Sequence, residues 1–325
     1  LLTGGSPYPA PNQFNVMPRV GLAYSISSND VIRAGLGGFM ARPGVYDSVF
    51  LGGNPPWQPM VSVSNGVADN PGGGARTSFP QFFMTIDPAY KIPRAYNWNV
   101  SYQRQLASDT TVEVGMVGTA SNYLSRERDL NQLPTGTTFK TENAGANVNY
   151  LRPFKGFANI PMLEHSGRGR YNGMQVELNR RFSKGLLYGF AYTLSKAMDN
   201  NSGPREGFMD VYNQQFNWGK SGNDTRHVAI INFVWEMPFF NRSSGPVRAA
   251  VGGWQISGLT QFQTGAPISI ANNDDYLGIG STNSKTWNLN GTPDRPKQFA
   301  NENANNNYIG VTNYWFTPTV DGKPC

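Results

Sequence analysis

Few side chains in this sequence have the types and spacing that catalysis or metal binding requires. The two histidines, His165 and His227, lie far apart along the chain, and the only cysteine is the last residue, Cys325. A structural zinc site or a disulfide framework needs several such residues at short spacing. We therefore interpret each histidine as part of a local hydrogen-bond cluster.

Carboxylates offer a second kind of chemistry. The Asp199-Asn200-Asn201 and Asp274-Asp275 segments could coordinate calcium in loops, but neither has the ligand spacing of an EF-hand. Glu113, Glu177 and Glu236 could serve glycoside hydrolysis only if two of them lay about 5–10 Å apart across a cleft. We favour the simpler interpretation that these three glutamates line a hydrated face of a β-sheet. The sequence predicts no cofactor, apart from calcium in the loops, and it predicts that the chain is not an enzyme.

Tryptophans are the remaining candidates for ligand contact. Some lie in segments that we expect to be loops, where an indole can stack on a sugar or pack one loop against another. We favour packing, but keep as possible loop ligand contacts Trp57, Trp218, Trp287 and Trp315.

The composition narrows the class of protein. Charged residues make up 15% of the 325 residues and aromatic residues 13%, whereas ordinary soluble proteins are roughly 25% charged. The net charge is +6, but the basic residues are scattered and form no stripe or motif, so nucleic-acid binding is not predicted. No stretch approaches the ~20 apolar residues of a membrane helix.

Alternation of side-chain character dominates the rest of the sequence. The clearest pair of segments is 171–182 and 186–195, in which Met174, Val176 and Leu178 alternate with polar residues. A period of two places successive side chains on opposite faces of a strand. One face is apolar and aromatic and the other is small or polar, as in a transmembrane β-barrel with lipid outside and water inside.

The same pattern assigns residues to the two faces. We predict as lumen-facing Gln103, Glu113, Gln175, Glu177, Gln255 and Gln261. We predict as lipid-facing Trp98, Val114, Tyr188, Phe190, Tyr192 and Trp235.

The predicted fold is all-β: an antiparallel transmembrane β-barrel segment of about eight strands. The strands form four hairpins at about 18–39, 96–118, 171–195 and 227–265, and the long loops lie at about 40–95, 119–170, 196–226 and 266–325. Outer-membrane barrels have short periplasmic turns and long extracellular loops. We therefore expect the short turns in the periplasm and the long loops outside the cell.

Specific strings carry a family resemblance. YNWNVSYQRQL at 96–106 with VEVGMVG at 112–118, then YNGMQVELNRRF at 171–182, resemble paired strands of TonB-dependent outer-membrane receptors of the Oar-like type. DTRHV at 224–228, WEMPFF at 235–240 and GGWQISG at 252–258 continue the series in the same order.

The resemblance implies a function and its partners. Such receptors sit in the outer membrane of Gram-negative bacteria and import a large nutrient, driven by the TonB energy-coupling complex acting on a plug inside a barrel of about 22 strands. Neither the plug nor an N-terminal domain is recognisable here, so we expect an internal part of the barrel. The partners implied are outer-membrane lipid, the TonB complex and an unknown nutrient. The alternative is a secreted or cell-surface β protein that binds glycans or self-assembles.

Overall fold

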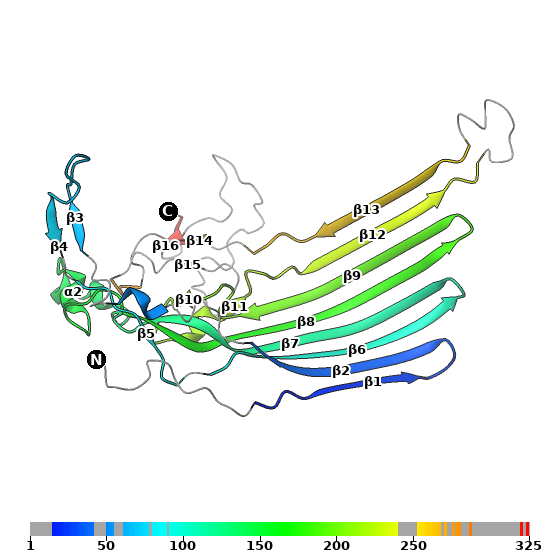
Figure 1. Ribbon diagram of the computed structural model, residues 1–325, viewed down its shortest axis with the longest axis horizontal. Coiled ribbons are helices and arrows are strands. Elements are labelled where there is room, and N and C mark those ends of the chain that lie inside the picture. The colour runs from blue at the N-terminus through cyan, green and yellow to red at the C-terminus, as the bar shows by residue number, and fades with distance from the viewer. Residues whose placement is uncertain are drawn as a thin grey trace.

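One large, curved, open β-sheet dominates the described part of the chain (Figure 1). The computed structural model describes residues 15–41, 50–54, 61–77, 80–89, 91–239, 252–267, 270–271, 275, 277–280, 286–287, 319–320 and 323–324. Eight long strands follow one another antiparallel across the sheet. In spatial order they are β1 Arg19–Ser25, β2 Asp30–Met40, β6 Arg94–Ala107, β7 Thr110–Asp129, β8 Pro161–Ser183, β9 Leu186–Asp199, β12 His227–Glu236 and β13 Gln255–Gln263.

Short elements complete the sheet and the connections. Three short strands raise the main sheet to eleven, and two of them, β5 and β10, pair in parallel. The prediction of eight antiparallel strands is therefore incomplete. The short strands are β3 Ser62–Ser64, β4 Ala75–Thr77, β5 Thr85–Ile86, β10 Glu206–Gly207, β11 Gly219–Lys220, β14 Ile270–Ala271, β15 Thr286–Trp287, β16 Thr319–Val320 and β17 Lys323–Pro324. The helical turns are η1 Phe50–Gly53, η2 Thr137–Phe139, η3 Thr141–Asn143, α2 Val148–Leu151 and η4 Gln214–Asn217.

Local sequence explains the tight turn between β8 and β9. Ser183 pairs with Leu186, so Lys184 and Gly185 form a two-residue loop, and both have positive φ (50° and 77°). Two successive positive φ values define the type I′ turn, whose twist matches that of the flanking strands. Figure 1 shows this turn at the same end of the sheet as the other hairpin turns, with the long connections gathered at the opposite end.

Strands β7 and β8 extend further than the alternation indicated. Residues 119–129 and 161–170, predicted as loop, continue the two strands past a bulge at Tyr123, whose φ is 61°. The loop boundary predicted at 119–170 is therefore wrong over these two stretches. Beyond residue 118 the strand ends bury polar residues such as Arg126, Glu164 and His165, so the apolar alternation does not continue there.

The register between strands places the two kinds of side chain on separate faces of the sheet. Gln103 opposes Glu113, Glu113 opposes Glu177, and the same row continues to Gln261. The next row holds apolar and aromatic residues: Tyr24, Ile32, Tyr102, Val114, Val176, Tyr192, Ala229 and Phe262. Directly opposed residues share a face, so one face is polar and the other apolar.

The apolar face has no cover within the described part of the chain. Val20 is 68% exposed and Met116 56%, and many neighbours on that face are also exposed. The buried apolar residues instead lie away from the strands' apolar face: Leu133, Ile160, Leu163, Val211 and Ile279. Among the described helices, none has the length and apolar character to cross a membrane.

Candidate functional site: the loop cap and the two sheet faces

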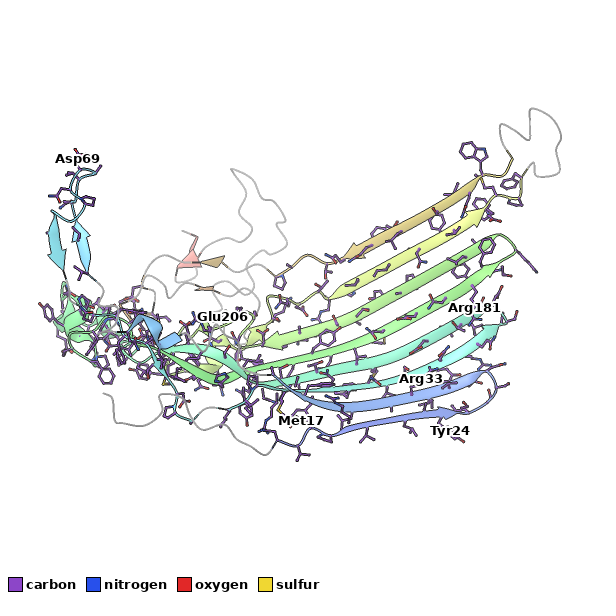
Figure 2. The ribbon with its side chains drawn as sticks, in the orientation of Figure 1. Met17, Tyr24, Arg33, Asp69, Arg181 and Glu206 are labelled. Carbon is purple, nitrogen blue, oxygen red and sulfur yellow. The ribbon has the colours of Figure 1, made fainter. Side chains whose placement is uncertain are left out.

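The long connections pack together at one end of the sheet. We call this region the loop cap: residues 130–160, 200–226, 275 and 277–280, with the adjoining ends of β7 and β8 (residues 119–129 and 161–170). Figure 2 labels Glu206 at this end and Arg181 toward the hairpin turns. A packed cap of loops on a rigid sheet is a common way to build a binding surface, so its internal contacts decide what it can do.

An ion pair buried between β7 and β8 joins the cap to the sheet. Arg128 donates from Nε to Oε2 of Glu164 at 2.5 Å and from Nη2 to Oε1 at 3.0 Å. Its remaining Nη1 donates to the carbonyl oxygen of Val211 at 2.5 Å. The bidentate geometry gives both charge-assisted strength and a fixed orientation. Arg128 therefore fixes the segment around residue 211 to the sheet.

Arg126 is the most deeply buried charged residue of the cap. It is 0% exposed, and its Cζ lies 3.6 Å from the centre of the Phe208 ring, whose face Arg128 also approaches at 4.4 Å. Nη2 donates to the carbonyl oxygen of Gly207 at 3.3 Å. In the described part of the chain, Nε and Nη1 of Arg126 have no hydrogen-bond partner. Phe208 thus holds two guanidinium groups by cation–π attraction.

Burial shifts two pKa values at this point, which lies beyond the membrane-spanning part of β7. Desolvation lowers the pKa of Arg126 to about 10, while the nearby carboxylates of Glu206 and Glu164 oppose that change. Arg126 therefore keeps its charge at neutral pH. Desolvation raises the pKa of Glu127, opposed by Arg205, whose Nε lies 2.9 Å from Oε1.

Asn131 organises the 130–160 connection. It is fully buried, and the two hydrogens of its Nδ2 are shared among the carbonyl oxygens of Phe154, Phe157 and Ala158, at 3.0, 3.1 and 2.8 Å. Its Oδ1 accepts from the backbone N–H of Phe154 at 2.7 Å. Arg152 donates to the carbonyl oxygen of Asn131 at 2.7 Å. One side chain thus satisfies the backbone of a whole turn, as buried polar groups require.

Further hydrogen bonds tie the connections to one another. Gln132 Oε1 accepts from the backbone N–H of Val211 at 2.8 Å, and Thr135 Oγ1 donates to Asp210 at 2.9 Å. Thr138 Oγ1 donates to Asp275 Oδ2 at 2.9 Å, although 137 residues separate the two in sequence. The loop cap is therefore held by contacts between distant segments.

The residues predicted for the two faces group as the register requires. All six predicted lumen residues lie on the polar face and all six predicted lipid residues lie on the apolar face. Which solvent each face meets stays a prediction. A polar hollow of about 250 Å³ lies on the polar face near the hairpin turns, and Gln103, Arg33 and Arg181 contribute to its lining.

The tryptophans predicted to contact ligand are only partly placed. Trp218 is half-buried and follows η4 in the loop cap. Trp57 and Trp315 lie outside the described residues, as does the side chain of Trp287. Contact of these residues with a ligand stays a prediction.

The histidines and acidic loops show ordinary protein contacts. His227 Nδ1 and Tyr192 Oη are hydrogen-bonded at 2.8 Å, and His165 is buried. Asp275 accepts from the backbone N–H groups of Ile279 and Gly280 at 2.8 and 2.7 Å. Asp274 lies outside the described residues. Within the described ranges, no group of three His, Cys, Asp or Glu side chains could hold a metal ion, and loop calcium stays a prediction.

Sequence reasoning missed the Arg126–Phe208 and Asn131 clusters. Arg126 and Arg128 were treated as scattered cations. Their spacing of two would place both on one face of a strand, but they fall within the stretch predicted as loop at 119–170. The partner Phe208 had no such signal, since its position depends on the parallel pairing of β10 with β7.

A sheet with one apolar exposed face, one polar face, short turns at one end and a loop cap at the other defines a membrane β-barrel wall. The comparison with protein families agrees: residues 3–323 match the family described as "Outer membrane beta barrel domain", and the chain belongs to that family. It is a protein of the Gram-negative outer membrane. A search of curated proteins gave no match.

Solved structures resemble the chain at low identity. The outer membrane transporter YddB from Escherichia coli is 9% identical with a TM-score of 0.43, covering 74% of this chain and 33% of its own. The FrpB iron transporter from Neisseria meningitidis is 10% identical with a TM-score of 0.41, covering 76% and 26%. The FpvAI–pyocin S2 complex is 10% identical with a TM-score of 0.41, covering 79% of this chain and 23% of its own. The chain thus spans about a quarter to a third of these proteins' length.

Proposed function

We propose that the chain is barrel wall and extracellular loop cap of a TonB-dependent outer-membrane transporter of the Oar-like type. In this proposal the eight long strands form four hairpins of the wall, with turns in the periplasm. The loop cap binds a large nutrient outside the cell, and the polar face lines the route inward. Partners are outer-membrane lipid and, through a plug, the TonB complex.

One observation carries the proposal: an apolar and aromatic face runs across all eight long strands, opposite a face that is mainly polar, with apolar exceptions such as Val31, Ile230 and Val234 on the polar side. Glu113 and Glu177 lie directly opposite each other on the polar face. Two like charges in that position destabilise a sheet unless water screens them. A hydrated lumen provides that screening, and the apolar face on the other side of the same strands then meets lipid.

The loop cap supports the transport part of the proposal. Arg128, Asn131 and Arg152 of the cap are occupied by internal contacts, so the cap holds a defined shape without ligand. A preformed cap lowers the ordering cost of binding. Trp218 and the other loop tryptophans remain our candidates for contact with the nutrient.

Transport can be tested by growth. A Gram-negative host that produces the intact protein should grow faster than a host without it on one of a panel of nutrients too large for porins. The difference should disappear when the TonB complex is deleted. An Asn131→Ala variant should lose the growth advantage while the protein stays in the outer membrane. Growth that is independent of TonB, or an intact protein recovered in the medium bound to glycans, would contradict the proposal.

A further inference from the structure

The apolar face of the sheet ends in a belt of basic residues. In one row across the strands, Asn122 lies between Arg94 and Arg168. In the next row toward the hairpin turns, Met198 lies between Arg170 and Lys220. Lys196 lies one row lower, opposite Asn172. We call this set the basic belt: Arg94, Arg168, Arg170, Lys196 and Lys220. The residues that share these three rows from β2 to β11 include no aspartate or glutamate.

Three members of the belt are available to a ligand. Arg168, Arg170 and Lys196 are exposed, and within the described residues none of them forms a salt bridge. Arg170 donates only to neutral oxygens, the shortest being the carbonyl of Gly169 at 3.0 Å. Positive charge without a protein counter-ion favours an anionic partner.

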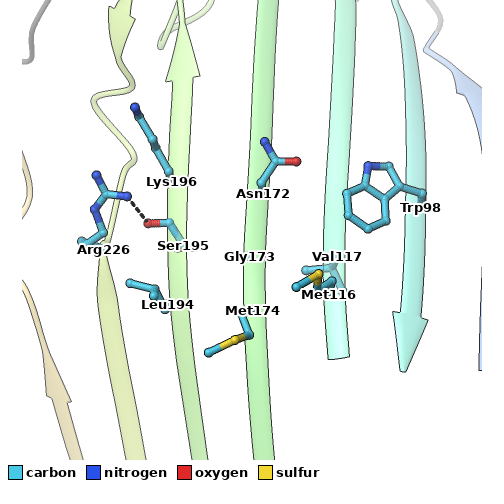
Figure 3. Close-up of a pocket in the computed structure, with 10 residues that line it drawn as sticks. All are labelled: Trp98, Met116, Val117, Asn172, Gly173, Met174, Leu194, Ser195, Lys196 and Arg226. Atoms are coloured by element: carbon cyan, nitrogen blue, oxygen red, sulfur yellow. Dashed lines mark hydrogen bonds between the residues drawn. The ribbon is translucent and has the colours of Figure 1, made fainter. Parts of the chain in front are cut away.

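An apolar hollow lies directly beside the belt. It has a volume of about 280 Å³, and its lining includes Trp98, Met116, Met174 and Leu194. Figure 3 shows Lys196 on one side of these apolar side chains, and in sequence it lies two residues beyond Leu194. Trp98 reaches over Gly118, where a Cβ atom would come within 2.2 Å of its Nε1. A side chain at residue 118 would displace this indole, so the absence of one allows Trp98 to form its part of the hollow's wall.

We propose that the belt and the hollow bind a phosphorylated glycolipid of the outer leaflet. This inference rests on the proposed function to the extent that the apolar face meets lipid. In that orientation the belt lies at the level of the head groups on the loop-cap side, since it follows the last apolar row toward the cap. Arg and Lys bind phosphate by charge-assisted hydrogen bonds, and the hollow accepts the first methylenes or the sugar face below the phosphate. Charge complementarity together with an adjoining apolar hollow selects a lipid over a free anion.

The test uses the intact protein, purified in a neutral detergent, and diphosphorylated lipid A counted by native mass spectrometry. Each basic residue near a charged membrane surface contributes about a fivefold factor to binding. The triple variant Arg168→Gln, Arg170→Gln, Lys196→Gln should therefore bind lipid A roughly a hundredfold more weakly. The matched control Arg33→Gln, Arg181→Gln, Lys184→Gln removes the same charge near the hairpin turns and should bind as the parent does. If the triple variant does not fold, the single variant Lys196→Gln should still show about a fivefold loss.

Three results would overturn the inference. The first is equal binding by the triple variant and the control. The second is complete displacement of lipid A by an excess of inorganic phosphate, at about 10 mM. That result would assign the belt to a free anion. The third is loss of a dimer, with lipid binding unchanged, in the triple variant, which would assign the belt to a second copy. If the protein binds lipid A but nutrient uptake is independent of TonB, the transport proposal is overturned and the lipid-binding inference stands.

Discussion

Two neighbouring positions on β9 provide the sharpest test of the sheet's orientation. Phe190 lies on the apolar face between Leu178 and Ile231, and the next residue, Ala191, lies on the polar face opposite Glu177. We predict that Phe190→Arg prevents assembly in the outer membrane and that Ala191→Arg does not. The two substitutions introduce the same side chain at adjacent residues, so each is the other's control.

The position of Phe190 along the strand sets the magnitude. It follows Leu186, the first residue of β9, by four residues, which at about 3.4 Å per residue and a tilt near 40° puts it roughly 10 Å from the turn. That is close to the middle of an apolar band about 25 Å tall. An arginine there costs about 3 kcal/mol, and loss of the ring's transfer to lipid adds about 2 kcal/mol. The free energy of unfolding should therefore fall by about 5 kcal/mol.

At Ala191 the new guanidinium meets water and the carboxylate of Glu177, so we expect a change within about 1 kcal/mol. The assays are the heat-dependent gel shift of outer-membrane fractions and urea titration of the intact protein in lipid vesicles. If both variants lose the same free energy, or if Phe190→Arg assembles as the parent does, the assignment of the apolar face to lipid is wrong.

Three further predictions concern turns and the loop cap. Gly185→Ala should lower the free energy of unfolding by about 2 kcal/mol and Gly253→Ala by about 1 kcal/mol, as measured by urea titration. Both glycines have positive φ, but only a Cβ at residue 185 meets a carbonyl oxygen, at 3.2 Å. Equal costs would contradict this reasoning. Hydrogen bonds from neighbouring hydroxyl groups, and to a smaller extent a nearby arginine, lower the pKa of Asp109. The Asp109→Asn variant should therefore be less stable than the parent above about pH 4, and this difference should vanish as the pH falls through the lowered pKa. A stability difference that persists at acid pH would refute the prediction. Phe208→Leu removes both cation–π contacts, including the one with Arg126, and should destabilise the loop cap by about 1–2 kcal/mol. The measurement is limited proteolysis, which should become faster within residues 200–226. Unchanged cleavage would count against the prediction.

The alternation in the sequence determined the strands and their two faces. Successive Cβ atoms of a strand point to opposite sides, so Met174, Val176 and Leu178 had to share a face whatever lay beside them. The turn between residues 183 and 186 was equally readable, because Gly185 readily adopts the positive φ that a two-residue turn requires. These properties are local, because they depend only on residues that are consecutive in the sequence.

Only the tertiary structure decided the loop cap and the basic belt. Arg126 is buried because Phe208, 82 positions later in the sequence, covers it after β10 has paired with β7. Arg168, Arg170 and Lys196 looked scattered along the chain, and the register between β8 and β9 brings them together. Contacts of this kind depend on which distant segments meet, and no periodicity within either segment encodes that choice. The sequence by itself determined a two-faced membrane sheet, and the pairing of its strands decided where its charges gather.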